Sequence, residues 1–294
     1  MARYYTSSKN GQDVIDITQV RFSSIVPDAP NSRASSYYDD SETNVAPCSF
    51  QSVWARLNTE NISSEKVQAV EIIERAETAA RSQSSNKLYY CFCCWRNPIA
   101  PIRSNVLVDE RIFIVALSKV PFSDSNPLHW ELLCSFYKHI MDTGRKPVAR
   151  YGSHWENVGF QGEDPASDLR GVGMLGLCQL LFLSSNALSP QLALQLYELS
   201  IDKVHHFPLA VVGLNFTQFI LEHVKEGRLN RLAIKENSYV SVINGIYRGC
   251  FITFYKLWKT RNCTILDFSK IANEIKAQIK QRPKFLLNMA VLRQ

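Results

Sequence analysis

The stretch HWENVGFQGEDPASDLRGVGMLGLCQLLFL, from His154 to Leu183, decides the fold because it joins a polar loop to an apolar helix. Within it, Asp164-Pro165 has the form of an N-cap followed by proline at the first helical position. The residues after Arg170 are apolar on both faces of a helix, which predicts burial on both. We therefore expect the central helix of a bundle to begin at Pro165.

Three glycines, Gly171, Gly173 and Gly176, lie inside this expected helix. Each costs about 1 kcal/mol relative to alanine in a helix interior. The cost is explained if another backbone approaches closely, or if the first turn is not regular helix. We interpret Gly173 and Gly176 as close-packing positions. For Gly171, which directly follows Arg170, the alternative is that it leaves room for a partner surface.

Arg170 is the only Lys or Arg between positions 151 and 202, and Glu163, Asp164 and Asp168 crowd the residues before it. In one interpretation its guanidinium pairs with these carboxylates and ties the loop to the helix. In the other, the rigid helix start projects Arg170 into a partner's phosphate site, where its planar, permanently charged group binds two oxygens. Asp164 as N-cap and Asp168 near the positive helix end have structural roles in both. Composition alone favours the ion pair.

The loop before the helix start offers weaker candidates. Trp155 and Phe160 are typical of local packing, whereas Gln161 either holds the loop or touches a partner. The segment GFQGEDPAS, at 159–167, lacks the Gly-Lys-Ser/Thr ending of a P-loop and follows no predicted strand. We therefore expect no nucleotide bound by the chain itself. No Ser or Cys occupies a recognised nucleophile setting beside His154, which disfavours a hydrolase.

The remaining sequence predicts an all-α fold, a single irregular helical bundle, because cap signals recur at helix-length intervals and no run alternates like a strand. We divide the chain into a disordered Ser/Asp-rich tail (1–46), an N-terminal helical extension packed on the domain (47–125) and the main helical domain (126–288). The expected helices cover about 49–57, 64–82, 105–120, 126–144, 165–183, 189–207, 208–227, 237–261 and 267–282.

Charge and hydropathy disfavour the nucleic-acid-binding, secreted and membrane-spanning classes of protein. The net charge of +6 on 294 residues, without a long basic run, is too mild to indicate nucleic-acid binding. The N-terminus lacks the apolar core of a secretory signal, and no apolar run reaches the ~20 residues of a membrane helix. We expect a cytoplasmic protein without a transmembrane segment.

The cysteines Cys91, Cys93 and Cys94 form a cluster among aromatic residues. No second pair of cysteines or histidines lies at a distance suited to a zinc site, so no metal is expected. Thiols packed in an aromatic patch are the simpler interpretation. Palmitoylation, with peripheral membrane association, is the alternative.

Many spaced positions in the central stretch agree with one known pattern. The pattern is Trp155, Gly159-Phe160-Gln161-Gly162, Asp164-Pro165, Asp168-Leu169-Arg170-Gly171 and Gly173. It resembles the signature of the ELMO-domain (engulfment and cell motility) family, and His154-Trp155-Glu156 with Leu169 resembles one vertebrate member in particular. The resemblance extends loosely upstream to about Ser49 and downstream to the helix at 237–261, and it excludes the tail.

The resemblance implies that residues 126–288 are an ELMO domain and that the chain activates Arf-family, notably Arf-like, small GTPases. It is then an enzyme regulator with no cofactor of its own, since GTP and Mg²⁺ belong to the partner. The family's essential arginine falls on Arg170, whereas Leu169 departs from the aromatic residue common before it. Residues expected to contact the GTPase or orient the loop are Trp155, Glu156, Gln161, Asp164, Asp168 and Gly171.

A second function stays open at this point. It is a non-catalytic module that binds Arf-family or cytoskeletal proteins in engulfment or cell-motility signalling. Either function is compatible with a cytoplasmic protein that associates with the cytoskeleton or with a membrane.

Overall fold

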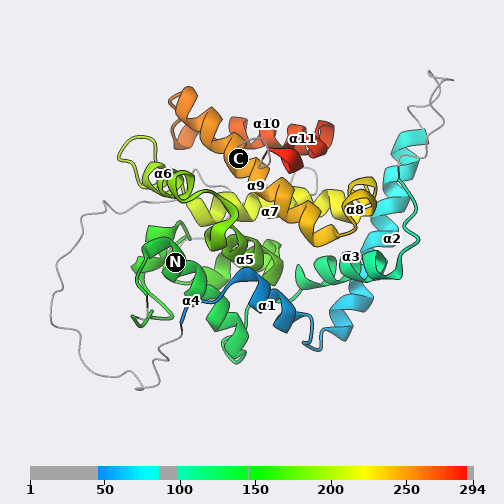
Figure 1. Ribbon diagram of the computed structural model, residues 1–294, viewed down its shortest axis with the longest axis horizontal. Helices are drawn as coiled ribbons and strands as arrows, with labels where there is room; N and C mark the ends of the chain where they lie inside the picture. The colour runs from blue at the N-terminus through cyan, green and yellow to red at the C-terminus, as the bar shows by residue number, and fades with distance from the viewer. Residues whose placement is uncertain (1–45, 86–98, 145, 290–294) are drawn as a thin grey trace, which may run out of the picture.

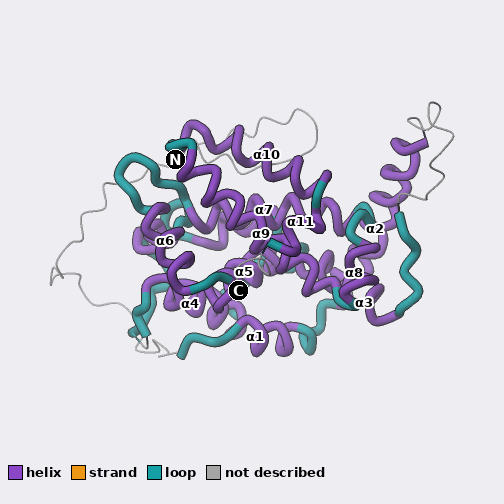
Figure 2. Tube along the Cα trace, turned by 45° about the horizontal axis from the view of Figure 1, so that its top comes forward, coloured by secondary structure: helices purple, strands orange, loops and turns teal. Residues whose placement is uncertain are grey.

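The computed structural model describes residues 46–85, 99–144 and 146–289, so the predicted tail lies outside it apart from Ala46. The α-helices are α1 (Phe50–Leu57), α2 (Ser63–Ser85), α3 (Asn105–Leu117), α4 (Pro127–Met141), α5 (Gly173–Phe182), α6 (Pro190–Ser200), α7 (Leu209–Lys225), α8 (Asn230–Glu236), α9 (Tyr239–Thr260), α10 (Phe268–Gln281) and α11 (Pro283–Asn288). Shorter helical turns are η3 (Ser153–Val158), η4 (Pro165–Gly171), η5 (Leu183–Ala187) and η6 (Ile265–Asp267). All regular elements in the described ranges are helical (Figure 2), which confirms the all-α prediction.

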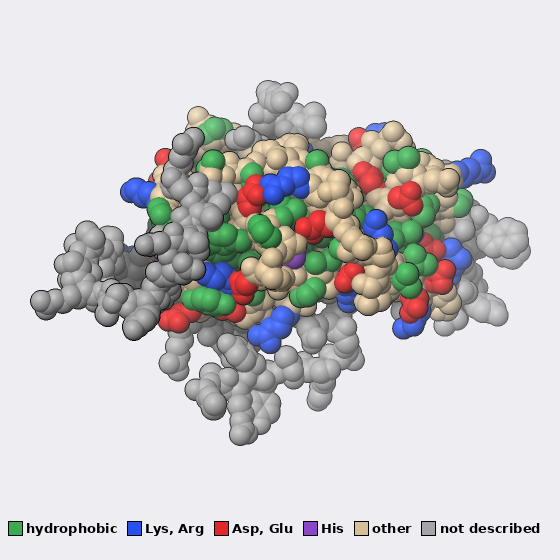
Figure 3. Space-filling view, turned by 90° about the horizontal axis from the view of Figure 1, so that it is seen from below, with side chains coloured by type: hydrophobic (Ala, Val, Ile, Leu, Met, Phe, Trp, Pro, Cys, Tyr) green, Lys and Arg blue, Asp and Glu red, His purple; other side chains and the backbone are tan. Residues whose placement is uncertain are grey.

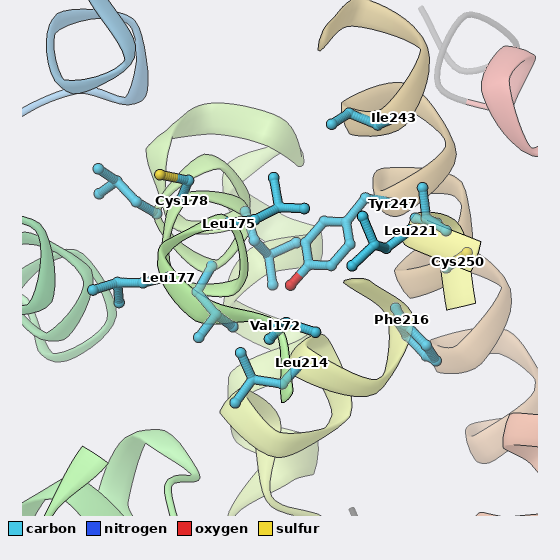
Figure 4. Packing of buried hydrophobic residues seen from close by; sticks show 14 of the residues in the cluster. Val172, Leu175, Leu177, Cys178, Leu214, Phe216, Leu221, Ile243, Tyr247 and Cys250 are labelled. Atoms are coloured by element: carbon cyan, nitrogen blue, oxygen red, sulfur yellow. The ribbon is translucent and has the colours of Figure 1, made fainter. Parts of the chain in front are cut away.

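The core lies where α5, α7 and α9 meet, near the middle of the ribbon in Figure 1. Its side chains come from all three helices, and Figure 4 shows Leu175, Leu214 and Tyr247 in one cluster. Gly213 in α7 makes room for this packing, because a Cβ there would lie 2.5 Å from the Tyr247 hydroxyl. Around this centre, α10 and α11 cover α9, while α4 covers α5 (Figure 1).

The central stretch differs from the single helix that the sequence predicts. Pro165–Gly171 forms the 3₁₀ helix η4, and the chain then bends by 110° before it continues as α5. Gly173 has a φ of +52°, and a Cβ at this position would lie 2.6 Å from the Val120 carbonyl oxygen. The backbone of Val120 and the left-handed conformation of Gly173 therefore break the helix. This agrees with the alternative that the first turn of the expected helix is not regular.

Gly176 lies within α5 and behaves as predicted. An added Cβ would lie 2.4 Å from Val172 Cγ2 and 2.7 Å from Leu214 Cδ2. The missing side chain thus allows α5 and α7 to pack closely.

One helix end and two short helices also differ from the predictions. Helix α6 ends at Ser200 because the Asp202 carboxylate accepts from the backbone N–H groups of Val204 (2.8 Å) and His205 (2.7 Å) in a turn. The expected helix at 189–207 is therefore too long. Helix α8 was not predicted, and Pro283, expected only to end α10, also begins α11.

Helix α2 packs on α3. The sequence favours Val67, Val70, Ile72 and Ile73 as its apolar face. Ile72 and Ile73 are half-buried against the core, but Val67 and Val70 are exposed, whereas Ala69 and Ala80 are buried. Within the described ranges, no single helix is long and apolar enough to cross a membrane, and the bent pair Pro165–Gly171 and Gly173–Ser185 meets that test only jointly. Figure 3 shows one face on which acidic, basic and apolar side chains are interspersed.

Candidate functional site

Helix η4 carries the residues of the candidate site, and its N-terminus is capped as predicted. Asp164 Oδ1 accepts a hydrogen bond from the Ala166 N–H (3.0 Å), and the Ser167 hydroxyl donates to the Asp164 carbonyl (2.8 Å). Pro165 at the first helical position and Leu169 near the last are both buried. Helix η4 is therefore anchored to the core along one side and capped at its start.

Arg150 makes the structural ion pair that the sequence had allowed for Arg170. Its Nη1 donates to Asp164 Oδ1 at 2.9 Å, and its Nε donates to the Asp124 carboxylate. The guanidinium lies over the rings of Phe122 (4.7 Å) and Tyr151 (4.4 Å). Arg150 therefore joins the loop after α3 to the start of η4, a role that no sequence pattern indicates.

Arg170 is exposed on the outer side of η4. Its Nε donates to the Ser167 carbonyl of the same helix at 3.0 Å. Arg170 belongs to none of the ion pairs found within residues 46–85, 99–144 and 146–289. Next to it, Gly171 is exposed, and a Cβ there would meet no atom within 4 Å. The guanidinium is therefore held by one neutral acceptor, with open space beside it.

Asp168 ties the glycine loop to η4. Its Oδ2 accepts a hydrogen bond from the Gln161 N–H at 2.7 Å, and its side chain is buried. Burial raises the pKa of Asp168 to about 7, although the Gln161 hydrogen bond and the charge of Arg170 oppose this rise. Gln161 therefore contributes to the site through its backbone and lies beside η4.

The loop that precedes η4 is held against the interior by Trp155 and Gly159. Trp155 is fully buried, its Nε1 donates to the Arg150 carbonyl at 3.1 Å, and its ring packs edge-on against Tyr137. Gly159 has a φ of +86°, and a Cβ there would lie 2.1 Å from the Leu209 nitrogen. Trp155 and Phe160 thus belong to the interior, while Glu156 lies half-buried on η3.

A groove opens beside Arg170, with a volume of about 470 Å³. Lys119, Val120 and Phe122 line one side, and Ala166, Leu169 and Arg170 line the other. The sequence did not indicate this groove, because its two sides lie about fifty positions apart in the chain and meet only through the bend before α5. The predicted lipidation sites Cys91, Cys93 and Cys94 lie outside the described residues.

The fold and this segment define the class of protein: the chain belongs to the ELMO/CED-12 family, whose sequence model matches residues 113–272. ELMO domain-containing protein 3 of Mus musculus is 32% identical over 182 residues, which cover 62% of this chain and 47% of that protein. ELMO domain-containing protein B of Dictyostelium discoideum is 29% identical over 164 residues, 55% of this chain and 56% of the relative.

A shorter match links the chain to ELMO domain-containing protein 2 of Homo sapiens, 34% identical over 116 residues that cover 40% of this chain and 39% of that protein. The chain thus spans about half the length of the curated relatives that it matches. No solved structure gave a significant match. The matched region contains η4 and the groove, whereas the predicted domain limits of 126–288 stay a prediction.

Proposed function

We propose that this chain is a GTPase-activating protein for Arf-family small GTPases, Arf-like ones in particular, and that Arg170 acts in trans on the GTP held by the partner. The observation that carries the proposal is the division of roles between two arginines. Arg150 neutralises Asp164, whereas Arg170 is exposed on a capped, anchored helix with a single carbonyl as its acceptor.

The chemistry of GTP hydrolysis explains why such an arginine is useful. Negative charge develops on the phosphoryl and leaving-group oxygens in the transition state, and a guanidinium brought to them from outside stabilises it. In other GTPase systems this contribution is about 10³–10⁵ in rate. To reach a partner, Arg170 gives up its hydrogen bond to the Ser167 carbonyl, and because the guanidinium is exposed, water replaces much of that interaction.

The partner class rests on the family resemblance of the segment around Arg170. GTP and Mg²⁺ would come with that partner. Leu169, which departs from the family's common aromatic residue, is buried and lines the groove. Its effect would therefore fall on the shape of the groove rather than on surface charge, and so on the choice of GTPase.

Single-turnover GTP hydrolysis on a panel of purified Arf and Arf-like GTPases tests the proposal. The unchanged chain is expected to accelerate at least one member, and Arg170→Ala and Arg170→Lys to lose roughly 10³-fold or more of that acceleration. Arg103→Ala removes another exposed arginine, one that does not line the groove, and serves as the matched control. Equal rates for all variants would exclude a catalytic arginine. Binding of the GTP form without acceleration would support the non-catalytic module instead.

A further inference from the structure

The groove beside Arg170 combines an apolar floor with a cationic rim. Val120 and Leu169 are buried at its base, and Phe122 and Ala166 stand half-buried at its sides. Lys119 and Arg170 are its two exposed cations. A cleft of this composition fits an apolar side chain accompanied by a negative charge.

The two exposed cations of the groove form no ion pair with acids in the described part of the chain. Asp164 also lines the groove, but Arg150 neutralises it at 2.9 Å. Lys119, like Arg170, belongs to none of the ion pairs in the described part of the chain. Burial and, after it, the charge of Lys119 lower the pKa of Lys225, so a further ammonium group lies close to Lys119. The rim therefore presents net positive charge to an approaching surface.

The walls of the groove are held in place before any partner arrives. Arg150 joins Asp124, two residues after the wall residue Phe122, to Asp164 on the other wall, and its guanidinium lies 4.7 Å from the Phe122 ring. His129 Nδ1 accepts from the Ser123 N–H at 3.0 Å and fixes the same loop from behind. Binding to a preformed groove avoids the entropic cost of ordering a loop.

We propose that this groove docks a segment of the GTP-bound partner protein that carries an apolar side chain next to a carboxylate, and that Lys119 selects the carboxylate. The inference rests on the proposed function in taking the partner to be a GTP-binding protein. Charge complementarity at the rim steers the encounter and sets specificity, while the apolar side chain fills the floor. Docking here places the partner's nucleotide within reach of Arg170, which lines the same groove.

The experiment measures equilibrium binding of the full chain to Arf-family GTPases loaded with a non-hydrolysable GTP analogue, alongside single-turnover hydrolysis over a range of chain concentrations. Lys119→Glu reverses the rim charge, and Ala166→Leu narrows the groove from its side without a change of charge. Lys284→Glu on α11, away from the groove, is the matched control. Thermal melting verifies that each variant is folded, which is expected for exposed Lys119 and Lys284.

Both groove variants are expected to weaken binding at least about tenfold and to raise the half-saturating concentration in hydrolysis by the same factor. The rate at saturation should change little for Lys119→Glu, whereas Arg170→Ala lowers it. Wild-type affinity for either groove variant, or an equal loss for Lys284→Glu, would overturn the docking inference. So would a failure of the unchanged chain to bind any GTP-loaded GTPase.

The two proposals can fail separately. Acceleration that depends on Arg170 but not on Lys119 would overturn the docking site and leave the activating function in place. Binding that depends on Lys119 and Ala166, without acceleration, would uphold the docking site and remove the activating function.

Discussion

The Nη1 atom of Arg150 lies 2.9 Å from Oδ1 of Asp164, and this ion pair separates the two arginines of the site into different roles. The same Asp164 oxygen caps η4 through the Ala166 N–H. Arg150 thus holds the start of the helix whose other end carries Arg170. Asp164 is engaged by Arg150 and Asp168 by the Gln161 N–H, while Arg170 stays exposed.

Replacing Arg150 should destabilise the protein. Arg150→Met leaves the Asp164 and Asp124 carboxylates without their partner, although both are partly exposed and solvent compensates in part. We expect a loss of about 1–2 kcal/mol in the free energy of unfolding. Arg170→Met, the matched control, should stay within about 0.5 kcal/mol of the unchanged chain because its side chain is exposed. Urea denaturation compares the two, and equal losses would contradict the division of roles.

Replacement by alanine should destabilise the protein at Gly173 but not at Gly171. Gly173→Ala forces a Cβ to 2.6 Å from the Val120 oxygen at a φ of +52°, with an expected cost of about 2 kcal/mol or more. Gly171→Ala meets open space, with an expected change of less than about 0.5 kcal/mol. Melting temperatures of the pair measure this difference. A tolerated Gly173→Ala would argue against the break between η4 and α5.

Asp168 should make stability fall as pH rises toward neutrality. Its pKa is about 7 in the folded protein against an ordinary value of 3.8, so the folded state binds more protons between pH 4 and 7. Ionisation across this window costs stability on the order of a few kcal/mol, and the loss is complete above pH 7. Asp168→Asn keeps an acceptor for the Gln161 N–H and should lack this slope. Free energies of unfolding at pH 5 and pH 8 test the prediction.

His223 should make stability rise with pH, opposite to the effect of Asp168. Burial, followed by the charges of Arg228, Lys276 and Lys280, lowers the pKa of His223 from 6.5 to about 4. The unfolded state then binds more protons in this window, so stability is present above pH 6.5 and is lost as pH falls toward 4. His223→Gln should be less sensitive to acid over this range. A double variant with Asp168→Asn should show nearly flat stability between pH 4 and 7.

Arg111 should be among the residues most sensitive to replacement. It is buried, pairs with Glu77 at 2.6 Å, and donates to the carbonyls of Val224 (2.9 Å) and Lys225 (3.0 Å) at the end of α7. Arg111→Met leaves these acceptors unsatisfied, with an expected loss of about 3–5 kcal/mol. Chemical denaturation measures the loss. Glu77→Gln keeps a polar partner for Arg111 and should cost less.

Local signals in the sequence predicted most helices correctly. Ser49, Asn126 and Ser189 cap α1, α4 and α6 through their side chains, and these caps depend only on neighbouring residues. Short helices such as α8 and α11 were missed because they hold too few residues for a clear period.

The parts of the site that the sequence did not predict depend on distant contacts. The bend before α5 is caused by the Val120 backbone, and the ion pair of Arg150 reaches Asp124 26 positions earlier. No local pattern encodes either contact. The family pattern did single out Arg170, but its exposure became visible only after Arg150 was placed beside Asp164.

The 110° bend between η4 and α5 has an evolutionary consequence. A continuous helix would transmit every adjustment of interior volume along its axis to the residues at its tip. Because α5 runs in a different direction from η4, a displacement of α5 along its own axis is not passed on along the axis of η4. Selection can therefore diversify the hydrophobic interior and the surface around Arg170 on separate timescales.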